Sequence, residues 1–169
     1  MATSKKTSGG TMPPGFVSPF KRVQMEERND DALACIATIT GNSLADVTKL
    51  AVQLGYPPHG PAFVDITLIN KILYNLGFES SGDYLDIASF DALPDVAILM
   101  VDYNEALDMG RHVVWHHVRG TENGLAFSYV VDVAQWLSDP AQYASADWRH
   151  IKTEPSWYIE VKPRATKRK

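Results

Sequence analysis

The amino-acid sequence predicts a single α+β domain in which helices come first and an antiparallel sheet follows. Between residues 31 and 76, apolar residues repeat at helical spacing. In four later segments, between residues 96 and 161, they alternate or run continuously, as in strands. The chain has 169 residues, of which 45% are hydrophobic and 21% charged. These values suit one globular domain with a sizeable core.

The two ends of the chain differ in composition from the part between them. Residues 1–20 are rich in Ser, Thr, Gly, Lys and Pro, which predicts a mobile N-terminal arm. Residues 163–169 form a basic tail, and such a tail is usually a solvated end. No internal repeat or linker interrupts the remainder. We therefore expect one folded domain over residues 21–162.

Three helices are expected in the first half of the chain, over residues 31–40, 44–54 and 63–76. Asn29 and Asp30 precede the first helix as capping residues, and Gly41 ends it. The third helix ends at Gly77, and one stripe of it carries Ile66, Ile69, Ile72, Leu73 and Leu76. A proline-rich loop over residues 56–61 separates the second helix from the third.

Four strands are expected thereafter, over residues 96–101, 112–118, 125–133 and 157–161. These segments are rich in β-branched and aromatic residues and are too short for typical helices. Residues 133–143 are typical of a loop or a short helical turn, closed by Asp139 and Pro140. Helices followed by antiparallel strands give an α+β layout.

Composition excludes several classes of protein. The net charge of −4 argues against a nucleic-acid binder, because such domains usually carry a basic face. A lone cysteine forms no internal disulfide, and no Cys/His spacing is typical of a zinc site. His112, His116 and His117 are close in sequence, but His116 and His117 point to opposite faces of a strand. We therefore expect neither a metal nor another cofactor.

The chain also lacks the signals of a membrane or secreted protein. No apolar run reaches the roughly 20 residues that a membrane helix needs. The basic start at residues 1–15 has no apolar stretch behind it, unlike a secretory signal. We expect a soluble protein without membrane contact, either cytoplasmic or exported without a cleaved signal peptide.

Three motifs carry a resemblance to a known family. The segment 24–41 (QMEERNDDALACIATITG) combines a glutamine, a polar stretch, two aspartates and a helix that ends in glycine. The segment 111–114 (RHVV) begins a predicted strand, and 129–132 (YVVD) lies in the next. In this order and spacing, the chain resembles the bacterial papain-like cysteine peptidases of the C39-like group over residues 24 to about 135.

This resemblance implies a papain-like fold and a set of site residues. The nucleophilic cysteine of the family falls on Asp31, at a helix N-terminus that would lower a thiol pKa. The resemblance makes His112 the general base and then the general acid. It makes Asp132, 20 residues further on, the acid that orients the imidazole. Gln24 would help to hold the oxyanion.

Structural roles for the same residues also stay open. His112 could be a satisfied core histidine, and Asp132 could be a turn or cap acid. Asp31 has three interpretations, because a carboxylate is a far weaker nucleophile than a thiolate. It is a deliberate inactivating substitution, or it marks a natural pseudoenzyme, or the true nucleophile is Cys35. Cys35 lies one turn inside the helix among small apolar residues, where cysteines are commonly buried and inert.

The function implied is that of a cysteine peptidase-like amide hydrolase acting on a peptide or protein. With Asp31 at the nucleophile position, this chain should be inactive or severely impaired. One alternative is a peptide-binding pseudopeptidase that grips its ligand without cutting it. Another is a glutamine deamidase or transglutaminase-like effector that uses the same triad. The sequence leaves the oligomeric state and the identity of the substrate open.

Overall fold

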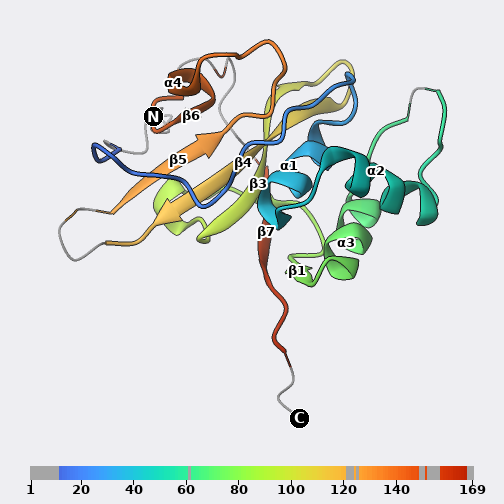
Figure 1. The fold of residues 1–169 in the computed structure, drawn as a ribbon, viewed down its shortest axis with the longest axis horizontal. Coiled ribbons are helices and arrows are strands. Elements are labelled where there is room, and N and C mark those ends of the chain that lie inside the picture. Colours follow the sequence, from blue (N-terminus) through green and yellow to red (C-terminus); the bar gives the residue numbers. More distant parts are fainter. Residues whose placement is uncertain are drawn as a thin grey trace.

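The fold is known from a computed structural model that describes residues 12–60, 62–120, 124, 126–148, 151 and 157–166. The helices are α1 (Asp31–Thr40), α2 (Leu44–Gln53), α3 (Ile66–Asn75) and the short α4 (Pro140–Tyr143), with a 3-10 turn at Phe90–Ala92. The strands are β1 (Phe78–Ser80), β2 (Leu85–Asp86), β3 (Val96–Asn104), β4 (Met109–Val118), β5 (Phe127–Val131), β6 (Ala144–Ser145) and β7 (Trp157–Pro163). Figure 1 shows α1, α2 and α3 gathered on one side of the molecule, with α4 and β6 on the other.

The strands of the described residues form one antiparallel sheet in the order β1-β7-β3-β4-β5-β6, and β2 also pairs with β7. Side chains alternate between its two faces. Ile98, Val114 and Val131 pack with the helices in one apolar cluster. Leu99 and Trp115 belong to a second cluster on the opposite face. The predicted α+β layout is confirmed.

Helix α1 is the central element of the helical layer. Every residue of it from Asp31 to Ile39 is buried. Its sequence has no polar stripe, and a helix that is apolar all round is stable when it is enclosed. Gly41 ends the helix in the left-handed conformation with a φ of 73°, as the sequence predicts.

The residue before α1 does not cap it as expected. The Asp30 side chain makes no capping hydrogen bond to the helix. Its Oδ2 instead accepts the backbone N–H groups of Glu26 at 3.2 Å and Glu27 at 3.0 Å. Asp30 therefore stabilises the turn that leads into the helix.

Side-chain caps set the starts of the next two helices. Ser43 accepts the N–H of Asp46 at 3.1 Å, at the start of α2. Asp65 accepts the N–H of Leu68 at 2.8 Å, so α3 begins at Ile66 rather than at Phe63. Phe63 is thereby left outside the helix, with 62% of its surface exposed.

Part of the segment predicted as an N-terminal arm contacts the sheet. Residues 1–11 lie outside the described residues. Phe16 packs edge-on against the rings of Phe127 and Tyr129. Ser18 Oγ lies 2.6 Å from the Tyr129 hydroxyl. The segment from residue 12 onward is therefore docked on the sheet, because its aromatic and hydroxyl groups find partners there.

The central hairpin is longer than the pattern indicates. β3 and β4 extend to Asn104 and from Met109, beyond the apolar runs. Asp102 and Asp108 both have positive φ, and the register shifts between Val101 and Asn104. Such a bulge hides the period-two signal.

No helix of the described residues is long and apolar enough to cross a membrane.

Gly110 provides a test of how tightly this hairpin is packed. A Cβ there would lie 2.7 Å from Val101 O and 2.9 Å from Met100 Cγ. We expect Gly110→Ala to lower the free energy of unfolding by about 1–3 kcal/mol, measured by urea denaturation. At Gly120, just beyond β4, the nearest atom to a Cβ is 3.9 Å away, so Gly120→Ala is the matched control. Equal effects of the two changes would contradict this close approach.

Candidate active-site cleft

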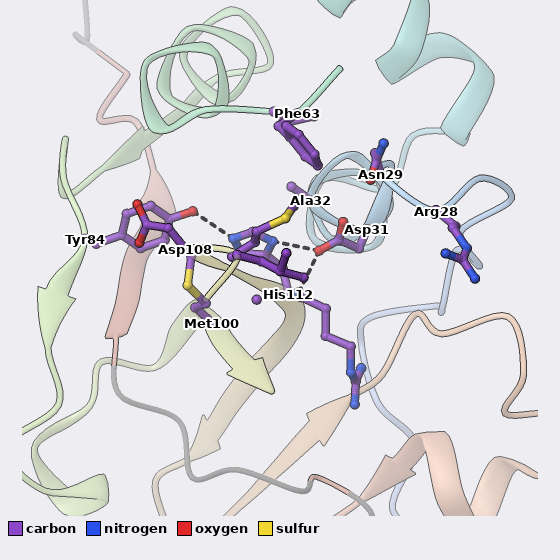
Figure 2. Close-up of a pocket in the computed structure, with 14 residues that line it drawn as sticks. Arg28, Asn29, Asp31, Ala32, Phe63, Tyr84, Met100, Asp108 and His112 are labelled. Carbon is purple, nitrogen blue, oxygen red and sulfur yellow. Dashed lines mark hydrogen bonds and ion pairs between the residues drawn. The ribbon is translucent and has the colours of Figure 1, made fainter. Parts of the chain in front are cut away.

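A cleft of about 380 Å³ opens where the start of α1 faces the β3–β4 hairpin. Figure 2 shows Asp31 and Tyr84 on either side of His112 within it, with Phe63 on the wall above. The lining residues come from four parts of the chain, namely Arg28, Asn29, Asp31 and Ala32; Phe63 and Val64; Tyr84; and Met100, Leu107, Asp108, Met109, Gly110, Arg111 and His112.

Asp31 and His112 meet in this cleft, as the sequence predicts. Asp31 Oδ2 accepts the backbone N–H of His112 at 2.7 Å. The same oxygen lies 2.7 Å from His112 Nδ1. Both residues are buried. The carboxylate also sits in the first turn of α1, where the helix dipole favours a negative charge. Two hydrogen bonds therefore join the start of the helix to strand β4.

The partners of the imidazole fix its tautomer. An ionised carboxylate only accepts hydrogen bonds, so Nδ1 of His112 carries the proton that faces Asp31. In the neutral ring, Nε2 is then an acceptor. The hydroxyl of Tyr84 lies 2.7 Å from Nε2, and with the ring neutral it donates to that nitrogen.

The environment of Tyr84 keeps its hydroxyl protonated. Burial raises the pKa of Tyr84 well above its ordinary value, and the nearby charge of Asp31 raises it further. Acid, imidazole and hydroxyl thus form a continuous chain, Asp31–His112–Tyr84, from the helix to the segment before β2 (Figure 2).

The expected hydrogen bond between Asp132 and His112 is absent from the described contacts of the ring, so this prediction is wrong. Both ring nitrogens face other residues. Asp132 Oδ1 instead accepts Arg111 Nη1 at 2.7 Å. The reason is the register, in which Val114 lies opposite Val131. Continued by two residues, that register would place Val133 opposite His112, and a one-residue offset turns Asp132 to the other face.

Arg111 joins two carboxylates on that other face. Its Nε contacts Asp102 at 2.7 Å, in addition to the contact with Asp132. Its guanidinium also lies 5.6 Å from the centre of the Trp136 ring. Burial opposes the charge of Arg111, but Asp132 and Asp102 outweigh it and raise the pKa of the guanidinium. Because Arg111 directly precedes His112, these ion pairs anchor β4 next to the histidine.

Gln24 does not take the place that an oxyanion donor needs. Its side chain is exposed, and Nε2 donates to the carbonyl of Gln135 at 3.2 Å. The residue is not part of the cleft lining. The structure therefore places Gln24 away from the cleft in which an oxyanion donor would have to lie.

Cys35 does not serve as an alternative nucleophile. It is fully buried, with no exposed surface, and does not line the cleft. Burial raises the pKa of its thiol well above the ordinary value, and the charge of Asp31 adds to the rise. A neutral, enclosed thiol is neither accessible nor nucleophilic.

His116 contacts a tyrosine of the neighbouring strand. No group of three or more His, Cys, Asp or Glu side chains that could hold a metal was found among the described residues. His116 Nδ1 lies 2.8 Å from the Tyr129 hydroxyl, and burial lowers its pKa. This pair belongs to the packing of the N-terminal segment on the sheet.

Two residues of the site were missed by sequence reasoning. Tyr84 lies in a short loop segment with no periodic pattern, so nothing indicates that it reaches His112. Arg111 was seen as part of the RHVV motif, but its ion pairs were not foreseen. Two nearby aspartates at positions 102 and 132 were the available signal for Arg111.

Comparisons with known proteins identify the fold. No protein-family model matches the sequence, and no curated protein matches it. The structure is similar to the peptidase domain of Streptococcus ComA, a bi-functional ABC transporter involved in a quorum-sensing pathway. The TM-score is 0.56 and the identity 17%, over 86% of this chain and 99% of that one. The chain thus has the papain-like α+β fold of this peptidase domain.

Two further solved structures align over similar lengths but with lower scores. The peptidase domain of Streptococcus mutans ComA has a TM-score of 0.47 and 18% identity, over 85% of this chain and 100% of that one. A double glycine motif protease from an AMS/PCAT transporter, in complex with its leader peptide, has a TM-score of 0.46 and 15% identity. It covers 83% of this chain and 89% of that one.

The buried network behind His112 should be far more important for stability than a surface ion pair. Asp132 has no exposed side-chain surface, so Asp132→Ala leaves Arg111 short of a buried partner. We expect a loss of about 3–5 kcal/mol in the free energy of unfolding, measured by urea denaturation. The matched control is Asp95→Ala, which breaks the exposed pair with Arg119 and should cost no more than about 1 kcal/mol. Equal losses would show that the network contributes little.

Thiol labelling tests the assignment of Cys35. Native protein should stay unlabelled by Ellman's reagent, because the thiol is enclosed and protonated. Denatured protein should react rapidly with one equivalent, since the chain has one cysteine. Fast labelling of the native protein would return Cys35 to the list of candidate nucleophiles.

Proposed function

We propose that this domain binds a peptide or protein segment in the papain-like cleft without cleaving it by cysteine chemistry. The observation that supports the proposal is the state of position 31. A carboxylate stands there, and it accepts two hydrogen bonds of 2.7 Å from His112. The position is therefore committed to holding the histidine.

Asp31 is a poor candidate for a nucleophile toward amides. A carboxylate is intrinsically weaker than a thiolate, and attack would give a mixed anhydride in place of a thioester. Oδ2 of Asp31 already accepts two hydrogen bonds, from the backbone N–H and from Nδ1 of His112. Breaking those bonds would also release the imidazole from its fixed orientation. These costs favour a binding role over a covalent one.

The walls of the cleft suit a polypeptide ligand. Phe63 and Leu107 line it with 62% and 66% of their surfaces exposed, so they are free to contact a ligand. Exposed aromatic and aliphatic side chains at the edge of a cleft are typical peptide anchors. Arg28 and Asn29 supply hydrogen-bonding groups on the same rim.

A latent amide hydrolase is the second candidate, and the position of His112 favours it. Nδ1 of His112 faces position 31 from 2.7 Å, which is where a base must stand to take the proton of a thiol. On this view, the activity lost at position 31 could be restored there.

The first test replaces the carboxylate with a thiol. Asp31→Cys should become reactive toward a peptide-amide probe with a thiol-directed warhead, whereas the unchanged protein and Asp31→Ala should not react. Adding His112→Ala to Asp31→Cys should slow labelling by about 10²–10⁴-fold, because the general base is lost. An unreactive cysteine at position 31 would remove the hydrolase candidate and leave the binding proposal standing.

The second test measures binding itself. Peptides selected from a random library on the unchanged protein should lose at least about tenfold in affinity with Phe63→Ser, measured by titration calorimetry. Tyr74→Ser is the matched control, because Tyr74 is 60% exposed on α3 and does not line the cleft. Failure to select any peptide, or equal losses from the two changes, would overturn the proposed binding cleft.

A further inference from the structure

We propose that Tyr84 is an acyl acceptor, with the Asp31–His112 pair as its general base, so that the cleft performs ester-type acyl transfer without a cysteine. The inference goes beyond the proposed peptide binding and rests on the geometry of the cleft alone. The acyl donor is an activated carboxylic ester.

The hydrogen-bond chain has the polarity that such a reaction needs. Asp31 Oδ2 holds Nδ1 of His112 at 2.7 Å, and Tyr84 Oη lies 2.7 Å from Nε2. Acid, imidazole and hydroxyl stand in the order found in Ser-His-Asp hydrolases, with a phenol in place of the serine hydroxyl. The backbone hydrogen bond from His112 to Asp31 fixes the ring further.

Tyr84 also has the access that an acceptor needs. It is partly exposed and lines the cleft. An acceptor needs both a histidine partner and exposure, and two other tyrosines each have one of these without the other. Tyr129 lies 2.8 Å from a ring nitrogen of His116 but is fully buried. Tyr74 is 60% exposed, and its described ring contact is with Arg164 rather than with a histidine.

The raised pKa of Tyr84 makes its reactivity dependent on His112. Because burial and the charge of Asp31 keep the phenol protonated at neutral pH, no free phenolate is available for attack. The proton must leave as the new bond forms, and Nε2 of His112 is the acceptor within reach. A phenolate with a lowered pKa would instead react without help from a base.

With p-nitrophenyl acetate as the donor, the acetyl group moves to the Tyr84 hydroxyl. Tyr84 Oη forms a bond to the acetyl carbon while its proton moves to Nε2 of His112. The bond between the acetyl carbon and the p-nitrophenyl oxygen breaks, and p-nitrophenolate leaves. The proton on Nε2 passes to solvent, so the ring returns to its neutral form. Later, Nε2 of His112 takes a proton from water, whose oxygen bonds to the acetyl carbon. The bond between that carbon and Tyr84 Oη breaks, acetic acid leaves, and the proton on Nε2 returns to Tyr84 Oη.

The experiment exposes the full chain to p-nitrophenyl acetate and maps acetylated tyrosines by mass spectrometry against time. In the unchanged protein, Tyr84 should acetylate at least about 100-fold faster than Tyr74, which is the internal standard in the same digest. His112→Ala should slow acetylation of Tyr84 by about 10²–10⁴-fold and leave Tyr74 unchanged. Asp31→Asn, which nearly preserves shape, should slow Tyr84 as well.

Three results would overturn the proposal, and the first two need no variant. They are acetylation of Tyr84 no faster than that of Tyr74, acetyl transfer to the ring of His112 rather than to Tyr84, and acetylation of Tyr84 that is unaffected by either substitution. Peptide selection and calorimetry are separate readouts. If the unchanged protein binds no peptide but acetylates Tyr84 rapidly, the proposed function is rejected and this inference is kept. If it binds peptides but acetylates Tyr84 slowly, this inference is rejected and the proposed function is kept.

Discussion

The contact between Asp31 and His112 holds the two layers of the domain together at the point where the cleft forms. It joins residues 81 positions apart in sequence, through two hydrogen bonds to one carboxylate oxygen. Both partners are buried, and in such surroundings an unpaired carboxylate would be costly. The contact therefore fixes the start of α1 against β4. It also orients the imidazole, whose Nε2 meets the hydroxyl of Tyr84.

Neighbouring side chains of β4 point to opposite faces of the sheet, so His112 and Arg111 make contacts on different faces. His112 points toward the helices and the cleft, whereas Arg111 points to the opposite face and pairs with Asp102 and Asp132. The buried carboxylate of Asp31 thus pairs with His112 on one face, and that of Asp132 pairs with Arg111 on the other. The ion pairs of Arg111 therefore anchor the strand next to His112, and Arg111 itself also lines the cleft.

The sequence predicted what local spacing decides and missed what register and loops decide. The terminal glycine of α1 follows from nearby residues, although the expected side-chain cap at Asp30 does not form. A motif that spans one helix and one strand start placed Asp31 beside His112. Asp132 was assigned to the wrong face because a one-residue change in strand pairing reverses the side chain, and sequence does not reveal that offset. Tyr84 lies before a two-residue strand, too short for any periodic signal.

A carboxylate at position 31 also changes which end of the imidazole can accept a proton. A thiol there would donate toward Nδ1, and that nitrogen would be the base. The carboxylate accepts instead, so Nδ1 keeps its proton and Nε2 becomes the basic nitrogen. The hydroxyl of Tyr84 meets the ring on this second nitrogen. Exchanging one donor for one acceptor at the start of α1 therefore moves the basic nitrogen of His112 from the side of the helix to the side of Tyr84.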